Sequence, residues 1–116
     1  MTIIVSVPDS AEGPLALAAA IDEAKAFGTD LVAVNLGLRP LKADVNGSGV
    51  DVTIVDRADR DPVDTVLDEI AKRNPSRLVI GVKRRSPVGK AMLGSVSQRL
   101  LLASPIPVLA VKLDED

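Results

Sequence analysis

Short apolar runs rich in β-branched residues alternate along the chain with longer segments in which apolar residues recur every three or four positions. The short runs have the length and composition of strands, and the longer segments have the period of helices. We therefore predict five strands, at residues 2–7, 31–36, 50–55, 77–80 and 107–112. Three helices are predicted between them, at about residues 11–27, 62–74 and 95–103.

The residues at the helix ends support these boundaries. Gly28 is suited to ending the first helix, because glycine readily takes the left-handed conformation that follows a last turn. The start of that helix leaves two alternatives, with Ser10 as the N-cap or Pro14 at the first helical position. The second helix has the stronger start, an Asp61 cap followed by Pro62, whose missing N–H is not needed there.

Strands that alternate with helices predict a doubly wound α/β fold, in which right-handed crossovers cover both faces of a parallel sheet. We expect one domain over residues 1–116, with the five strands in the order 3-2-1-4-5. Such sheets bind ligands beyond the carboxyl ends of the strands, where the strand order reverses. Here the reversal falls between the first and fourth strands, so Pro8, Asp9 and Ser10 should face the segment after Ile80.

Composition removes several classes of function. The chain has no cysteine and no histidine, which excludes disulfides, the usual zinc sites and every mechanism based on imidazole, so we expect no enzyme. A single aromatic residue, Phe27, leaves no stacking platform, and we expect no specific nucleic-acid binding. No apolar run approaches the ~20 residues of a membrane span and no cleavable leader is evident, so a cytoplasmic protein without membrane contact is expected.

The net charge of −2 hides a basic region in the last third of the chain. Residues 82–113 contain no acid, and their basic side chains are Lys83, Arg84, Arg85, Lys90, Arg99 and Lys112. The predicted strand ending at Ile80 leads through this region, which we expect to form a glycine-bearing loop, to a helix start at Gly94–Ser95. Unpaired N–H groups and the helix dipole favour anions at such a start, which predicts a phosphate group and hence a nucleotide.

In several segments along its length, the chain resembles the universal stress protein family. The resemblance rests on IIVSVPDSAEG at the start, Asp61–Pro62 opening a helix, then LVIG, Gly94–Ser95 and PVLAV in family order. It implies binding of ATP or another adenine nucleotide, with Mg²⁺, and a stress-response or regulatory role. It also implies a homodimer formed through the last strand, from Pro107 to Lys112.

The family's nucleotide-binding motif, as the resemblance gives it, is a glycine, two residues, a glycine, nine residues, and a glycine followed by serine or threonine. Gly81 and Gly94–Ser95 match it, whereas Arg84 takes the middle glycine position and Pro8 takes that of an acidic residue. The candidate nucleotide-binding residues are Pro8, Asp9, Ser10, Val34, Asn35, Gly81, Val82, Arg84, Gly94, Ser95 and Val96. Lys83, Arg85 and Lys90 are candidate phosphate contacts.

Several of these residues also have a structural explanation. Ser95 and Gln98 match a capping box, in which the serine caps the helix and the glutamine reaches back to it. Asp9 is placed either to cap the first helix or to contact a ribose or a metal, and Asn35 either to end a strand or to read an adenine edge. Asp56, Asp59 and Asp61 lack calcium-loop spacing, and we expect no metal site in the protein itself.

Two hypotheses of function follow. The first is a small nucleotide-binding protein of the universal stress protein type, and the second is a dimeric interaction module of the same fold that binds no nucleotide. Arg84 separates them, because its side chain either blocks the close approach of a phosphate to the backbone or replaces that contact with a guanidinium.

Overall fold

The computed structural model describes residues 1–41, 47–85 and 90–115, and it describes the backbone alone at residues 84–85, 90–92 and 114–115. The elements, in chain order, are β1 (Thr2–Val7), α1 (Glu12–Phe27), β2 (Asp30–Asn35), β3 (Val52–Asp56), α2 (Pro62–Arg73), β4 (Arg77–Arg85), β5 (Lys90–Met92), α3 (Ser95–Ala103) and β6 (Val108–Glu115). No helix among these described residues is long and apolar enough to cross a membrane.

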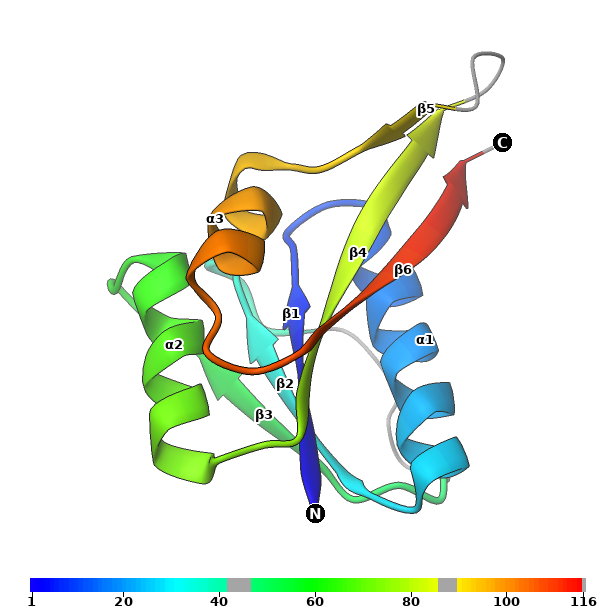
Figure 1. Cartoon of the computed structure of the whole chain (residues 1–116), viewed down its shortest axis with the longest axis vertical. Helices are drawn as coiled ribbons and strands as arrows, with labels where there is room; N and C mark the ends of the chain where they lie inside the picture. The colour runs from blue at the N-terminus through cyan, green and yellow to red at the C-terminus, as the bar shows by residue number, and fades with distance from the viewer. Residues whose placement is uncertain (42–46, 86–89, 116) are drawn as a thin grey trace.

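The predicted doubly wound sheet is confirmed. Its parallel strands lie in the order β3-β2-β1-β4-β6, which is the expected order 3-2-1-4-5 when the last strand is counted fifth. Helix α1 covers one face, and α2 and α3 cover the other (Figure 1). One strand was not expected: the short β5 pairs antiparallel with the end of β4.

The core consists of two layers, one on each face of the sheet. Ile3, Val5 and Val7 pack on the α1 face together with the small helix residues Ala16 and Ala20. On the opposite face, Ile4 and Val34 pack with Val66 and Ile70 of α2 and with Leu100 of α3. Successive residues of a strand point to opposite faces, so a strand that is apolar at nearly every position supplies both layers.

The helix ends agree in part with the prediction. Gly28 ends α1 in the left-handed conformation, with φ of 64°, and Asp61 caps α2 by accepting a 3.0 Å hydrogen bond from the Asp64 N–H. Both predicted starts of α1 are wrong. Ala11 occupies the N-cap position, no side chain caps the helix, and Pro14 is the third helical residue. The first turn still tolerates proline, because its N–H groups have no partner within the helix.

The segment after Ile80 is a strand where we expected a loop. Strand β4 continues to Arg85, because β6 extends past Lys112 to Glu115 and pairs with it over residues 78–85. Gly81 therefore lies inside a strand. A Cβ there would lie 2.6 Å from Leu113 Cδ1, so the glycine makes room for this side chain of β6.

Candidate functional site

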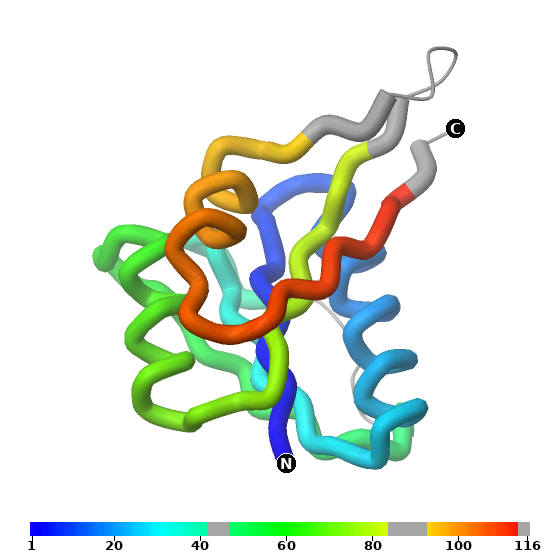
Figure 2. The backbone as a smooth tube through the Cα atoms, in the orientation of Figure 1, coloured from blue at the N-terminus to red at the C-terminus, as the bar shows by residue number. Residues whose placement is uncertain are grey.

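A pocket of about 390 Å³ lies at the carboxyl edge of the sheet, at the predicted reversal of strand order. Four segments distant in sequence form it: the end of β1 and the turn after it, the start of the loop after β2, the loop between β3 and α2, and the first turn of α3. Figure 2 shows the turn after β1, in blue, beside the start of α3, in orange. The lining residues are Ser6, Pro8, Asp9, Leu36, Arg57, Pro62, Gly94, Ser95, Val96 and Ser97. This pocket thus places Pro8 and Asp9 beside Gly94 and Ser95, whereas Ser10, Gly81 and Lys83 are not among its lining residues.

The start of α3 faces this pocket without a side-chain cap. Gly94 is the N-cap residue and Ser95 the first helical residue, so the predicted capping box of Ser95 and Gln98 is wrong. The Gln98 link to the cap is through the backbone, its N–H donating to the Gly94 carbonyl at 2.9 Å. The N–H groups of Ser95, Val96 and Ser97 precede the first intrahelical bond and lie at the positive end of the helix dipole. This arrangement suits an anion.

Gly94 has no packing reason to be a glycine. A Cβ at this position would have no heavy atom of the described chain within 4 Å, and its φ of −65° is open to any residue. Gly81 differs, because Leu113 occupies the space that its Cβ would need. The missing Cβ at Gly94 leaves the backbone at the start of α3 open to a ligand.

A second pocket, of about 280 Å³, lies on the other side of Pro8. It is lined by Pro8, Ser10, Glu12, Gly81, Lys83, Gly94, Ser97 and Leu113. Lys83, predicted as a phosphate contact, forms an ion pair of 2.9 Å between its Nζ and Glu12 Oε1. The Ser10 hydroxyl donates to the other oxygen of that carboxylate at 2.5 Å. Glu12 was not predicted, although its place in the first turn of a helix beside the Pro8–Ser10 turn is a sequence signal that could have found it.

Arg57 is a site residue that the sequence analysis missed. It follows β3 and lines the 390 Å³ pocket. Its Nε donates to the Leu36 carbonyl at 2.5 Å and its Nη1 donates to the Arg60 carbonyl at 2.8 Å. Two backbone carbonyls thereby fix the guanidinium in the pocket wall. No local motif marks this arginine, because only the fold brings the loop after β3 to the start of α3.

Val34 and Asn35, predicted beside an adenine, have structural roles in this conformation. Val34 is fully buried in the layer beneath α2. Asn35 is buried and its amide is engaged: Nδ2 donates to the Arg39 carbonyl at 2.8 Å and to Asp56 Oδ1 at 2.9 Å, and Oδ1 accepts from the Gly37 N–H at 3.0 Å. These bonds fix the loop after β2, which agrees with the strand-end alternative.

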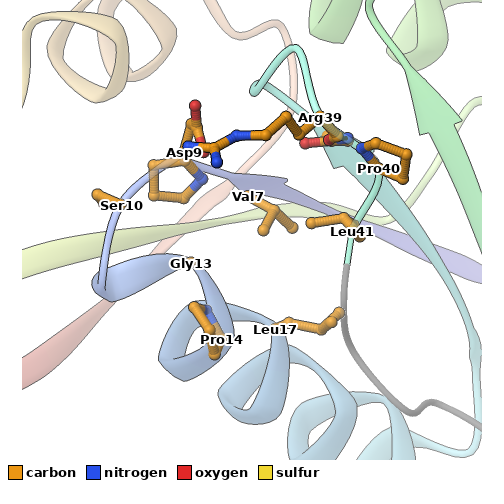
Figure 3. Close-up of a pocket in the computed structure, with 11 residues that line it drawn as sticks. Val7, Asp9, Ser10, Gly13, Pro14, Leu17, Arg39, Pro40 and Leu41 are labelled. Carbon is orange, nitrogen blue, oxygen red and sulfur yellow. Dashed lines mark hydrogen bonds between the residues drawn. The ribbon is translucent and has the colours of Figure 1, made fainter.

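Asp9 lies between that loop and the site. A Cβ on Gly37 would come within 2.8 Å of Asp9 Cβ, so the aspartate packs directly against the glycine. Asp9 also lines a third pocket, of about 220 Å³, with Val7, Pro14, Leu17, Arg39 and Leu41 on the α1 side of the sheet. Figure 3 shows the Arg39 side chain extending across this pocket toward Asp9. Asp9 is exposed and does not cap α1.

The remaining predicted residues divide into three groups. Val96 lines the 390 Å³ pocket, whereas Val82 is buried and lines an apolar pocket between β4, β6 and α3. The backbones of Arg84, Arg85 and Lys90 lie in the β4–β5 pairing, and their side chains lie outside the described residues. Gly89, the glycine that the sequence places in the loop expected after Ile80, is not a predicted site residue and also lies outside the described residues.

The acidic residues near the site are engaged in structure. Among the described residues, no three acidic side chains gather as a metal site would require. Asp56 accepts from Asn35, as given above, and Asp61 caps α2. The hydrogen bond from the Asp64 N–H and the Arg99 guanidinium 3.6 Å away hold the pKa of Asp61 below its ordinary value.

Comparison with known proteins agrees with this fold. The family model described as the universal stress protein family matches residues 37–112. A curated universal stress protein of Mycolicibacterium smegmatis is 34% identical over 125 aligned positions, which cover 95% of this chain and 96% of the relative. A universal stress protein structure from Archaeoglobus fulgidus superposes with a TM-score of 0.73 at 24% identity, covering 97% and 98% of the two chains. The structure of the universal stress protein from Archaeoglobus fulgidus in complex with dAMP gives 0.68 at 21% identity, with the same coverage.

Proposed function

The chain belongs to the universal stress protein family, and on this premise we propose that it binds an adenine nucleotide, such as ATP, and serves a stress-response or regulatory role. The observation that carries the proposal is the uncapped start of α3, which opens onto a pocket large enough for the phosphate end of a nucleotide. A protein of the same fold has a solved structure in complex with dAMP, which supports an adenine nucleotide as the ligand class.

We assign the phosphates to the backbone of Gly94, Ser95 and Val96, where the helix dipole and unpaired N–H groups favour negative charge. Asp9 offers carboxylate oxygens to ribose hydroxyls or to a Mg²⁺ ion carried by the nucleotide. The adenine would lie toward the turn after β1 and the loop after β2. Asn35 shapes that end through the loop backbone that its hydrogen bonds hold in place, and Val34 packs in the core beneath it.

Binding without efficient turnover is the activity that we propose. The chain has no histidine to act as a general base. Asp9 packs against Gly37 rather than standing beside a nucleophile. The nucleotide would act by ordering the loops that line the pocket.

We further propose that residues 1–116 form one domain that dimerises through β6. This strand pairs with β4 on one side, and no described strand pairs with its other edge. An apolar edge strand favours pairing with a second copy of the chain. Because β6 extends to Glu115, the pairing edge is longer than the predicted segment from Pro107 to Lys112.

Isothermal titration with Mg-ATP tests the proposal. We expect saturable binding to the wild-type protein and its loss in Ser95→Glu, because a carboxylate at the first helical position repels phosphate. The fold should survive, since acidic residues in a first turn stabilise a helix. Ala103→Glu is the matched control: it adds the same charge to the exposed far end of α3, about 12 Å away, and should leave binding intact.

Absence of binding by the wild-type protein at millimolar nucleotide would reject the proposal. It would favour the interaction module that binds no nucleotide. Equal binding by wild type and Ser95→Glu would place the nucleotide away from α3.

A further inference from the structure

The two pockets that flank Pro8 differ in what their charged side chains already contact. Both open at the start of α3, since Pro8, Gly94 and Ser97 line each of them. A phosphate chain bound at this helix start can therefore extend into either pocket, toward Arg57 or toward Gly81. The charged side chains in each pocket determine which course is more favourable.

In the pocket on the Gly81 side, the positive charge of Lys83 is already paired with the carboxylate of Glu12. Lys83 lies 2.9 Å from Glu12 Oε1, and the carboxylate is mostly buried, with 12% of the side chain exposed. A phosphate in this pocket would meet the Glu12 charge at short range and would have to compete with it for Lys83. The side chain of Leu113 also fills the space above Gly81. This direction is unfavourable for a polyphosphate.

The pocket on the Arg57 side presents a cation that no described acid pairs with. Arg57 uses two of its five N–H groups, on the Leu36 and Arg60 carbonyls. Within the described part of the chain, its remaining donors, including both of Nη2, have no hydrogen-bond partner. The two carbonyl contacts fix the plane of the guanidinium, so little side-chain entropy is lost when an anion binds. Asp9 lines the same pocket, but it is exposed and packs against Gly37.

We propose that Arg57 is a phosphate-binding residue and that the phosphate chain of the nucleotide turns toward Arg57 rather than toward Gly81 and Lys83. This proposal rests on the proposed function. The guanidinium then supplies a charge-assisted contact opposite the N–H groups of α3. This contact makes the protein bind a nucleotide more tightly than the corresponding nucleoside, which has no phosphate.

The test compares Mg-ATP and adenosine binding to wild type and to Arg57→Gln. Loss of a charge-assisted contact should weaken ATP binding by about 10- to 100-fold. Adenosine binding should change by less than about threefold, because adenosine has no phosphate. Arg60→Gln is the matched control: this neighbouring arginine contacts Asp68 on the surface at 3.5 Å, and the Arg60 carbonyl that holds Arg57 is retained. It should bind ATP like wild type.

Each outcome separates this inference from the proposed function. If wild type binds ATP and Arg57→Gln binds it equally well, the inference is wrong and the proposed function stands. If ATP and adenosine weaken together in Arg57→Gln, Arg57 only supports the loop, and the inference is again wrong. Lys83→Gln provides a second check: strong loss of ATP binding in this variant, with Arg57→Gln unaffected, would place the phosphates on the Gly81 side. If wild type binds neither compound, the proposed function itself fails.

Discussion

Gly81 and Gly94 are the first and last glycines of one motif, yet they are glycines for different reasons. At Gly81 the protein itself needs the space, because Leu113 Cδ1 would lie 2.6 Å from a Cβ. At Gly94 the described chain needs neither the space nor an unusual backbone angle. A glycine without an internal reason is best explained by what approaches from outside.

The contrast gives a stability prediction. Gly81→Ala should lower the free energy of unfolding by about 1–3 kcal/mol, the usual cost of forcing an extra methyl group into a packed site. Gly94→Ser should leave it unchanged or raise it slightly, because serine is a favoured N-cap. Urea denaturation of both variants checks this. Equal losses in the two variants would contradict the assignment.

Asp61 gives a pH prediction at the same scale. Its pKa is lowered in the folded protein by the hydrogen bond from the Asp64 N–H and by Arg99. Its charged form therefore stabilises the fold above the unfolded-state pKa of about 3.9, and this contribution is lost as the pH falls through the lower folded-state value. Asp61→Asn keeps a capping oxygen but cannot titrate. Its stability should fall less steeply than that of wild type below about pH 4. Urea denaturation across a series of acidic pH values measures both curves, and parallel curves would contradict the claim.

At the scale of elements, the sequence predicted what local chemistry decides. The Asp61–Pro62 start of α2, the Gly28 end of α1 and the span of α3 all follow from residues at the element itself. The length of β4 does not, because its last residues are held by pairing with β6, which lies about 30 positions further along the chain. Hydrophobic periodicity and helix-capping residues are local patterns, so they do not reveal a pairing partner that is distant in sequence.

The candidate site divides in the same way. Pro8, Asp9, Gly94 and Ser95 were predictable, because strand order places the ends of neighbouring strands together and a glycine before a helix marks an anion site. The Lys83 ion pair with Glu12 and the placement of Arg57 depend on side chains that meet only after folding. The sequence therefore predicted where the site lies in the fold better than which charged side chains line it and which of them are paired.

Helix α3 offers a test in which stability and binding move in opposite directions. Gly94→Asp should stabilise the helix, because an aspartate N-cap satisfies a free N–H and suits the dipole. The same carboxylate should abolish nucleotide binding by occupying the anion position. Thermal unfolding and ATP titration of one sample measure both effects. Gly94→Asn, a cap without charge, is the control for the bulk of the side chain. A Gly94→Asp variant that binds ATP like wild type would contradict the assignment of the phosphates to α3.

At the scale of the whole molecule, the edge of β6 determines the proposed assembly. The Leu78 N–H donates to the Pro107 carbonyl at 2.9 Å, and backbone groups of successive strand residues point to alternate sides. The N–H of Ala110 therefore points away from β4, toward the edge that no described strand pairs with.

Ala110→Pro should convert the dimer to a monomer. Proline removes the outward N–H and is tolerated at an edge strand, so the pairing with β4 is retained. Sedimentation equilibrium of wild type and variant measures the change, with circular dichroism to confirm the fold. A wild-type monomer at high concentration, or a Ala110→Pro variant that still dimerises, would contradict assembly through β6.

The whole account depends on a nucleotide meeting the free N–H groups at the start of α3, where the sheet reverses its strand order. The most direct measurement is an ATP titration of the ¹⁵N-labelled wild-type protein, followed through its amide resonances. We predict saturable shifts at Ser95, Val96 and Ser97 and at Asp9, with little change at the far end of α3. No shift at these amides in millimolar ATP, or shifts confined to residues remote from α3, would contradict it.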